Sequence, residues 1–92
     1  LWSDIRLEYD EIDSIEYLAD GVAGRRINGF GSGKLLMGLF RNDELGTYTR
    51  YSYTKCPSAI LINCGGDWLV LSGENEAETQ SMYEELLSRL EP

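Results

Sequence analysis

The residues that most invite a chemical role lie in one stretch, RRINGFGSGKLLMGLF, which runs from Arg25 to Phe40. It combines basic residues with four glycines, and a glycine-rich loop with a lysine can cradle a phosphate. The phosphate-loop pattern fails, because Asn28 replaces its first glycine and Leu35 its hydroxyl, and G-x-G-x-x-G fails in both registers. Both patterns also lead into a helix, whereas this stretch leads into a strand-like run. We therefore interpret the glycines as scaffold that permits bulges, bends and close approach of backbones.

The charge distribution leaves room only for a small anion site. The chain carries a net charge of −8, yet residues 21–66 hold six bases and two acids, while residues 1–20 and 67–92 each hold seven acids and one base. Nucleic acid and anionic lipid repel an acidic chain, so neither is an expected default partner. The candidate binding residues for an anion or a lipid headgroup are Arg25, Arg26, Lys34 and Arg41. The alternative is that these bases lie opposite the acids of the two ends.

The remaining polar groups do not predict catalysis. The chain has no histidine, so the usual base of a hydrolytic triad is missing, and neither lysine sits in a serine motif. The carboxylates of EYDEID, residues 8–13, could bind a cation, but they lack the calcium-loop pattern and favour a solvated acidic edge. Arg50 with its neighbouring tyrosines could recognise a ligand, although such tyrosines more often pack across strands. We expect no enzymatic activity, no metal and no cofactor.

The two cysteines, Cys56 and Cys64, are predicted to be free thiols. An extended segment of eight residues spans roughly 26 Å, whereas a disulfide needs Cα atoms within about 7 Å. Free thiols are typical of a reducing compartment, which favours the cytoplasm.

Hydrophobic periodicity predicts one mainly β domain over residues 1–92, with seven short strands followed by one helix. Gly65-Gly66 is the strongest hairpin signal, and residues 41–46 form a polar hairpin loop. The helix runs from about Glu76 to Leu90, with Asn75 and Glu78 as a capping box and Leu86 and Leu87 buried. So small a sheet is expected to bend strongly or to form a partly open barrel, with the helix over one end. The predicted strands cover residues 5–9, 12–18, 25–30, 34–40, 47–53, 59–64 and 67–72.

These motifs together resemble a bacterial pleckstrin-homology-like (PH-like) domain family. The resemblance rests on YDEIDSIEYL, on R-x-N-G-F-G from Arg26 to Gly31, on G-x-F from Gly38 to Phe40, and on the ILINCGGDWLVLS hairpin before the final helix. It implies a bent, seven-stranded antiparallel β-barrel closed by the C-terminal helix, in a domain of largely unknown function. Such domains often follow membrane-spanning segments, and we expect this chain to be a fragment of a longer protein.

The expected function is therefore a non-enzymatic interaction or self-assembly module, the cytoplasmic part of a bacterial membrane-associated protein. Its expected partner is a protein or a second copy, and membrane contact would come only through the missing upstream segment. The alternative is a module that binds an anion or a lipid headgroup through the basic middle of the chain.

Overall fold

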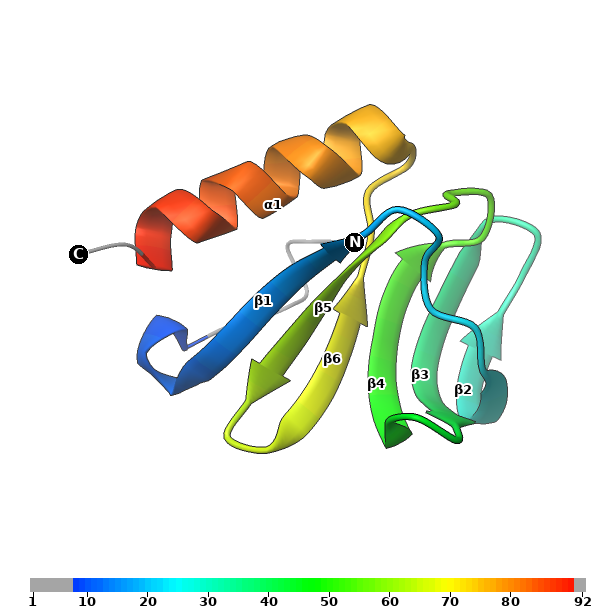
Figure 1. Ribbon diagram of the computed structural model, residues 1–92. Helices are drawn as coiled ribbons and strands as arrows, with labels where there is room; N and C mark the ends of the chain where they lie inside the picture. Colours follow the sequence, from blue (N-terminus) through cyan, green and yellow to red (C-terminus); the bar gives the residue numbers. More distant parts are fainter. Residues whose placement is uncertain (1–7, 91–92) are drawn as a thin grey trace.

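The computed structural model describes residues 8–90, without the side chain of Phe30, and folds them into one sheet and one long helix (Figure 1). Residues Tyr9–Glu11 form a short 3-10 turn. The strands are β1 (Ile12–Leu18), β2 (Arg25–Gly31), β3 (Leu35–Asn42), β4 (Gly46–Tyr53), β5 (Ala59–Cys64) and β6 (Asp67–Leu71), and the helix is α1 (Glu76–Leu90).

The sheet has the strand order β1-β5-β6-β4-β3-β2, so within residues 8–90 the edges are β1 and β2 and the sheet is not closed. All neighbours are antiparallel except β4 and β6, where Thr49–Tyr51 run parallel to Leu69–Leu71. The prediction of an antiparallel barrel is wrong on both counts. The physical reason is that the β4–β5 connection skips one strand position, which the tight turn after β5 then fills with β6.

The count of seven strands also differs, because residues 8–90 contain six. The predicted first strand included Ile5 and Leu7, which lie outside the described residues, and its last residue, Tyr9, belongs to the 3-10 turn. The hairpin predicted at Gly65-Gly66 is confirmed. Gly65 and Gly66 form a two-residue turn with φ of 57° and 93°, which suits a hairpin.

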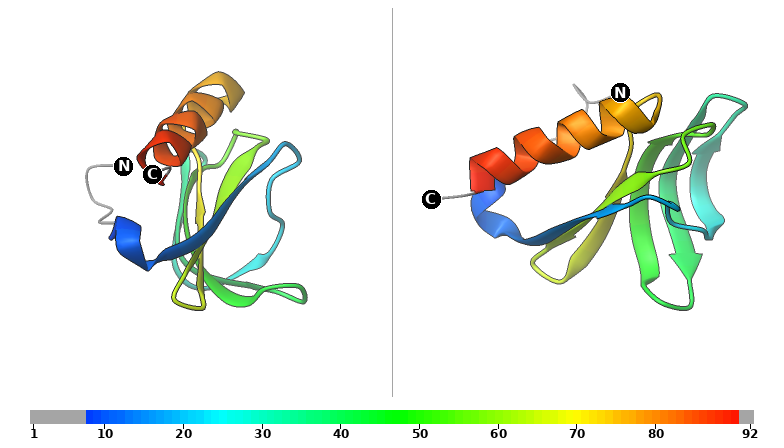
Figure 2. Two further views of the ribbon diagram at one scale, coloured as in Figure 1. Left: turned by 60° about the vertical axis from the view of Figure 1, so that its left-hand side comes forward. Right: turned by 45° about the horizontal axis from the view of Figure 1, so that its top comes forward.

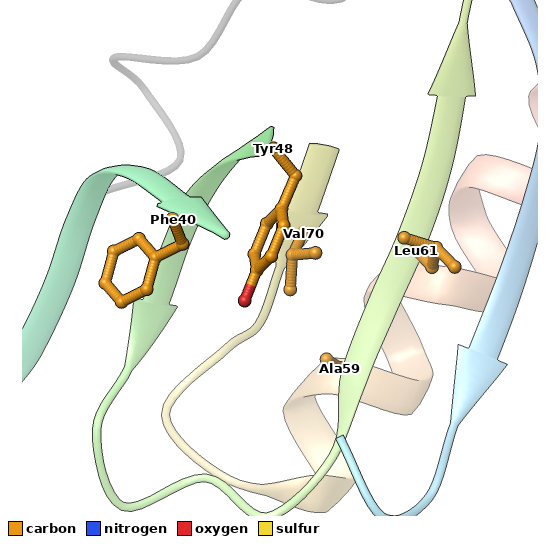
Figure 3. Close-up of a cluster of buried hydrophobic side chains, with 5 residues drawn as sticks. All are labelled: Phe40, Tyr48, Ala59, Leu61 and Val70. Carbon is orange, nitrogen blue, oxygen red and sulfur yellow. The ribbon is translucent and has the colours of Figure 1, made fainter. Parts of the chain in front are cut away.

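Two apolar clusters lie on opposite sides of the sheet. The inner cluster contains Phe40, Tyr48, Ala59, Leu61 and Val70 (Figure 3) and packs against the connection between β1 and β2. The helix-side cluster joins Ile60, Ile62 and Leu71 to Leu86 of α1. Alternate residues of β5 therefore enter different clusters, and this strand is buried on both faces.

Helix α1 has the predicted bounds, and one half of its predicted capping box forms, since the Asn75 side-chain oxygen accepts the Glu78 N–H at 2.8 Å. The Glu78 side chain lies beside Gly73 instead of accepting the Asn75 N–H. Leu86 is 6% exposed, as expected, but Leu87 is 36% exposed and its predicted burial is wrong. Consecutive helical residues differ by about 100° in direction, so Leu87 is turned away when Leu86 faces the sheet.

Two glycines of the glycine-rich stretch permit a close approach of backbones, as the scaffold interpretation predicted. Gly29 and Gly38 lie opposite each other on β2 and β3, with φ of 138° and 122°. A Cβ atom on either glycine would overlap the backbone of the facing strand. Ile27 is an extra residue in the register between Arg26 and Asn28, so a bulge bends β2 beside this close approach.

Candidate functional site

The candidate site is the helix-side surface of strands β2, β3 and β4, which we call the outer face. Pairing across β6, β4 and β3 places Leu71, Tyr51 and Met37 on the same side of the sheet. Helix α1 packs against β1 and β5, and on this side of the sheet no part of residues 8–90 covers β3 and β2 (Figures 1 and 2). The described apolar and aromatic residues of the outer face are Leu35, Met37, Leu39, Tyr51 and Tyr53.

Burial differs sharply between the two sides of β3 and β4. On the inner side, Phe40 and Tyr48 are 3% and 2% exposed. On the outer side, Leu39 is 41% exposed, and Ile27, at the bulge beside it, is 51% exposed. The other apolar and aromatic residues of the outer face, Leu35, Met37, Tyr51 and Tyr53, are half-buried. Single exposed leucines are common, but here Leu39 and Ile27 lie next to partly exposed apolar residues of adjacent strands, an arrangement typical of a docking site.

Arg25 and Arg41, two of the predicted ligand residues, lie at one end of the outer face. They are direct partners on β2 and β3, and both are exposed. The Arg41 guanidinium donates a long hydrogen bond of 3.4 Å to Thr47. Both arginines line a surface hollow of about 370 Å³ together with Asp43, so an acid lies within this basic end.

Lys34 lies at the opposite end of the β2–β3 hairpin, beyond the seven residues of β2. At about 3.3 Å per residue, this strand separates Lys34 from Arg25 by roughly 20 Å. Lys34 lines a hollow of about 460 Å³ with Lys55, Tyr53 and Glu74. The loop is anchored there, because Thr54 N–H donates to the Lys34 carbonyl oxygen at 2.8 Å.

Arg26, the remaining predicted ligand residue, points to the other side of the sheet. It lies opposite Phe40 in the register, and its guanidinium packs over Gly31. The structure thus brings together Arg25 with Arg41, and Lys34 with Lys55, but it does not gather all four candidates. Sequence reasoning missed Lys55, because only the pairing of β3 with β4 brings residues 34 and 55 to one end.

Arg50 uses its guanidinium for contacts within the domain, so it is not a candidate ligand residue. Its guanidinium donates to the Val22 carbonyl oxygen at 2.6 Å and to the Ser52 hydroxyl at 2.8 Å. It also lies 5.5 Å from the centroid of the Phe40 ring. These contacts fasten the connection between β1 and β2 onto the inner cluster, so Arg50 acts as a structural cation.

The acidic N-terminal segment forms no metal site within residues 8–90, where no group of three acidic, cysteine or histidine side chains could hold an ion. Both cysteines are free thiols, as predicted. Burial raises the pKa of the Cys64 thiol, and the carboxylates of Glu11, Asp13 and Asp67 raise it further. A raised pKa disfavours the thiolate, which is the reactive form.

Residues 1–88 match the family described as Bacterial PH domain. The match covers nearly the whole chain, so the chain belongs to the bacterial PH domain family, as its motifs predicted. The mainly β sheet with its C-terminal helix is consistent with a PH-like fold, and PH domains are generally non-catalytic modules. A search of curated proteins and a search of solved structures returned no match. No helix within residues 8–90 combines the length and apolar composition that a membrane-spanning helix requires.

Proposed function

We propose that this PH-like domain is a non-enzymatic interaction module that docks a protein, or a second copy of itself, on the outer face. The observation that carries this proposal is the incomplete cover of the sheet. Helix α1 buries the helix side of β1, β5 and β6, while Leu39 on β3 remains 41% exposed. Removing such apolar surface from water is the main favourable contribution to protein association.

The composition of the outer face supports this proposal. Met37, Tyr51 and Tyr53 belong to residue types that are enriched at the centres of protein interfaces. The charged residues Arg41 and Lys34 lie at the two ends of β3, so they form a polar rim around an apolar centre. Buried centre and charged rim are the usual arrangement of a protein-binding surface.

In the parent protein, we propose that the module lies in the cytoplasm as part of a bacterial membrane-associated protein. The two free thiols, Cys56 and Cys64, support a reducing compartment. The resemblance of its motifs to PH-like domains that often follow membrane-spanning segments supports the association with a membrane protein.

Site-specific photo-crosslinking in bacteria that produce the full-length protein tests the docking proposal. A benzophenone amino acid at position 39 probes the outer face, and the same group at the exposed position 16 on β1 is the matched control. We expect intermolecular adducts from position 39 and few from position 16. Equal yields at both positions, crosslinks only within one chain, or no adduct at position 39 would overturn the proposal.

Anion or lipid-headgroup binding is a second candidate function, favoured by the hollow between Lys34 and Lys55. Glu74 in the same hollow weakens the attraction for an anion. Inositol hexakisphosphate and anionic vesicles can be titrated at low and at physiological salt, because electrostatic binding weakens with ionic strength. Binding that is lost in Lys34→Ala/Lys55→Ala but kept in Arg25→Ala/Arg26→Ala would support this hollow. Binding that neither pair of substitutions changes would exclude Arg25, Arg26, Lys34 and Lys55 as ligand residues.

A further inference from the structure

We infer that the outer face is occupied by the exposed side of helix α1 from a second copy of this chain, so that copies join head to tail. This inference rests on the proposed function and names the partner. In each contact, one copy contributes its outer face and the other contributes its helix.

Charge complementarity is the first observation that supports this partner. The apolar centre of the outer face is bounded by Arg25 and Arg41 at one end and by Lys34 and Lys55 at the other. Each end also holds one acid, Asp43 or Glu74, so the bases outnumber the acids at both ends. Helix α1 contains four glutamates and a single arginine, Arg89, which pairs with Glu85 at 3.1 Å, so three glutamates have no basic partner within the helix. Opposite charges on two surfaces favour their encounter and orient one on the other.

The exposed flank of α1 has the pattern that such a contact needs. The helix buries Thr79 and Leu86 on its own sheet. Glu76, Gln80, Glu84 and Leu87 follow one another at spacings of four, four and three residues, which places them along one flank, and all four are exposed. Leu87, 36% exposed, supplies an apolar contact at the C-terminal end of this flank. The unexpected exposure of Leu87 on α1 thus matches that of Leu39 on β3.

The two surfaces also match in length. Helix α1 has 15 residues and is therefore about 22 Å long. Strand β3 has eight residues and spans about 26 Å. Three strands about 4.8 Å apart give a face of roughly 400 Å², against roughly 800 Å² per partner in a standard stable complex. We therefore expect a weak, concentration-dependent contact.

One copy can use both surfaces at once, because α1 and the outer face occupy different parts of the molecule (Figure 2). Such a contact joins unlike surfaces, so it generates rings or open chains instead of a closed dimer. Addition of a strand at the β2 edge is the less favoured route. The bulge at Ile27 and the exposed Arg25 and Arg26 are features that protect edge strands from pairing.

Sedimentation velocity of the purified protein over a wide dilution series tests the inference. We expect an average mass that rises with protein concentration, and we expect both Leu39→Asp and Leu87→Asp to keep the protein monomeric. Both positions are exposed, so thermal melts should show that the variants remain folded. Glu16→Lys, an exposed change on β1, is the control and should associate like the unsubstituted chain.

Mixing the Leu39→Asp and Leu87→Asp variants shows whether the contact joins two different surfaces or two copies of the same surface. Leu39→Asp keeps an intact helix flank and Leu87→Asp keeps an intact outer face, so their mixture should form a dimer with one copy of each and nothing larger. As a second test, Arg41→Glu should weaken association, and Glu84→Lys on the other copy should restore it.

The inference is overturned if the purified protein stays monomeric at every concentration, if Leu87→Asp associates normally, or if the mixed variants do not pair. Monomers that still crosslink to another protein from position 39 in cells would remove the second copy as partner and leave the proposed docking function standing. Monomers that bind vesicles through Leu39, without crosslinks to protein, would overturn both in favour of a membrane surface.

Discussion

Strands β3 and β5 are both apolar runs, but β5 is buried on both faces and β3 on only one. In β5, Ile60 and Ile62 are 0% exposed under α1, and Ala59 and Leu61 are buried in the inner cluster. In β3, Phe40 is buried on the inner side, whereas Leu39 is 41% exposed on the outer side. An apolar strand is therefore consistent with two buried faces or with one buried face and one docking face, and the position of the helix decides between them.

The largest expected effect comes from breaking the close approach that bends the β2–β3 half. Gly38→Ala places a Cβ atom against the Asn28 carbonyl and forces alanine to a φ of 122°. We expect the free energy of unfolding to fall by about 2–5 kcal/mol, from backbone strain and overpacking together. Gly33→Ala is the matched control, because a Cβ atom there meets no atom within 4 Å. Denaturant melts of the two variants should differ clearly, and equal melts would contradict the role assigned to Gly38.

The next largest effect on stability distinguishes the buried side of α1 from its exposed side. Leu86→Ala removes a side chain that is 6% exposed against Ile60 and Ile62, so we expect a loss of about 2–5 kcal/mol in unfolding free energy. Leu87→Ala removes a side chain that is 36% exposed, and we expect a loss under about 1 kcal/mol. Chemical denaturation measures both values, and a larger loss for Leu87→Ala would show that the buried flank is misassigned.

Arg50→Met tests whether the Arg50 guanidinium fastens the connection between β1 and β2 onto the inner cluster. The substitution keeps much of the apolar stem and removes the hydrogen bonds to the Val22 carbonyl and the Ser52 hydroxyl. We expect a loss of about 1–3 kcal/mol, since hydrogen bonds to a charged group are lost at a half-buried site. Amide hydrogen exchange in residues 19–24 should become faster. Arg41→Met, at an exposed position, should leave that exchange unchanged.

The smallest expected effect concerns Cys64. Its raised pKa means that the folded state holds the thiol proton more tightly, so this contribution to stability is lost as the pH rises through the raised pKa. Asp13→Asn removes one of the charges that raise the pKa, and we expect Cys64 to react with iodoacetamide roughly twofold faster at mildly alkaline pH. A Cys56→Ser background leaves Cys64 as the only thiol. An unchanged rate would show that the charge of Asp13 does not contribute to the raised pKa.

Local features of the fold could be predicted from the sequence because local residues determine them. The Gly65-Gly66 turn, the bounds of α1 and its Asn75 cap depend on residues close together in the chain. The placement of β6 beside β4 could not be predicted, since it depends on contacts between distant segments. The burial of Leu87 was predicted wrongly for a related reason, because an apolar stripe does not fix the width of the buried side.

The candidate site was predictable only in part. The sequence marked Arg25, Arg26, Lys34 and Arg41 as candidate ligand residues, but it did not show that they lie at two separate ends of β2 and on both sides of the sheet. Neither Lys55 nor the outer face itself carries a sequence signal, because Leu35, Met37 and Leu39 look like ordinary core residues of a strand. Whether such residues are covered depends on where α1 lies on the sheet.

Methyl-resolved NMR of the purified protein across a dilution series tests the central claim most directly, because it compares the two regions within one sample. We predict that the methyl signals of Met37, Leu39 and Leu87 shift together as the protein is concentrated. Those of Ile60 and Ile62, which are 0% exposed, should stay in place. Signals that never move with concentration, or that move in β5 while Leu39 stays fixed, would contradict self-association through the outer face.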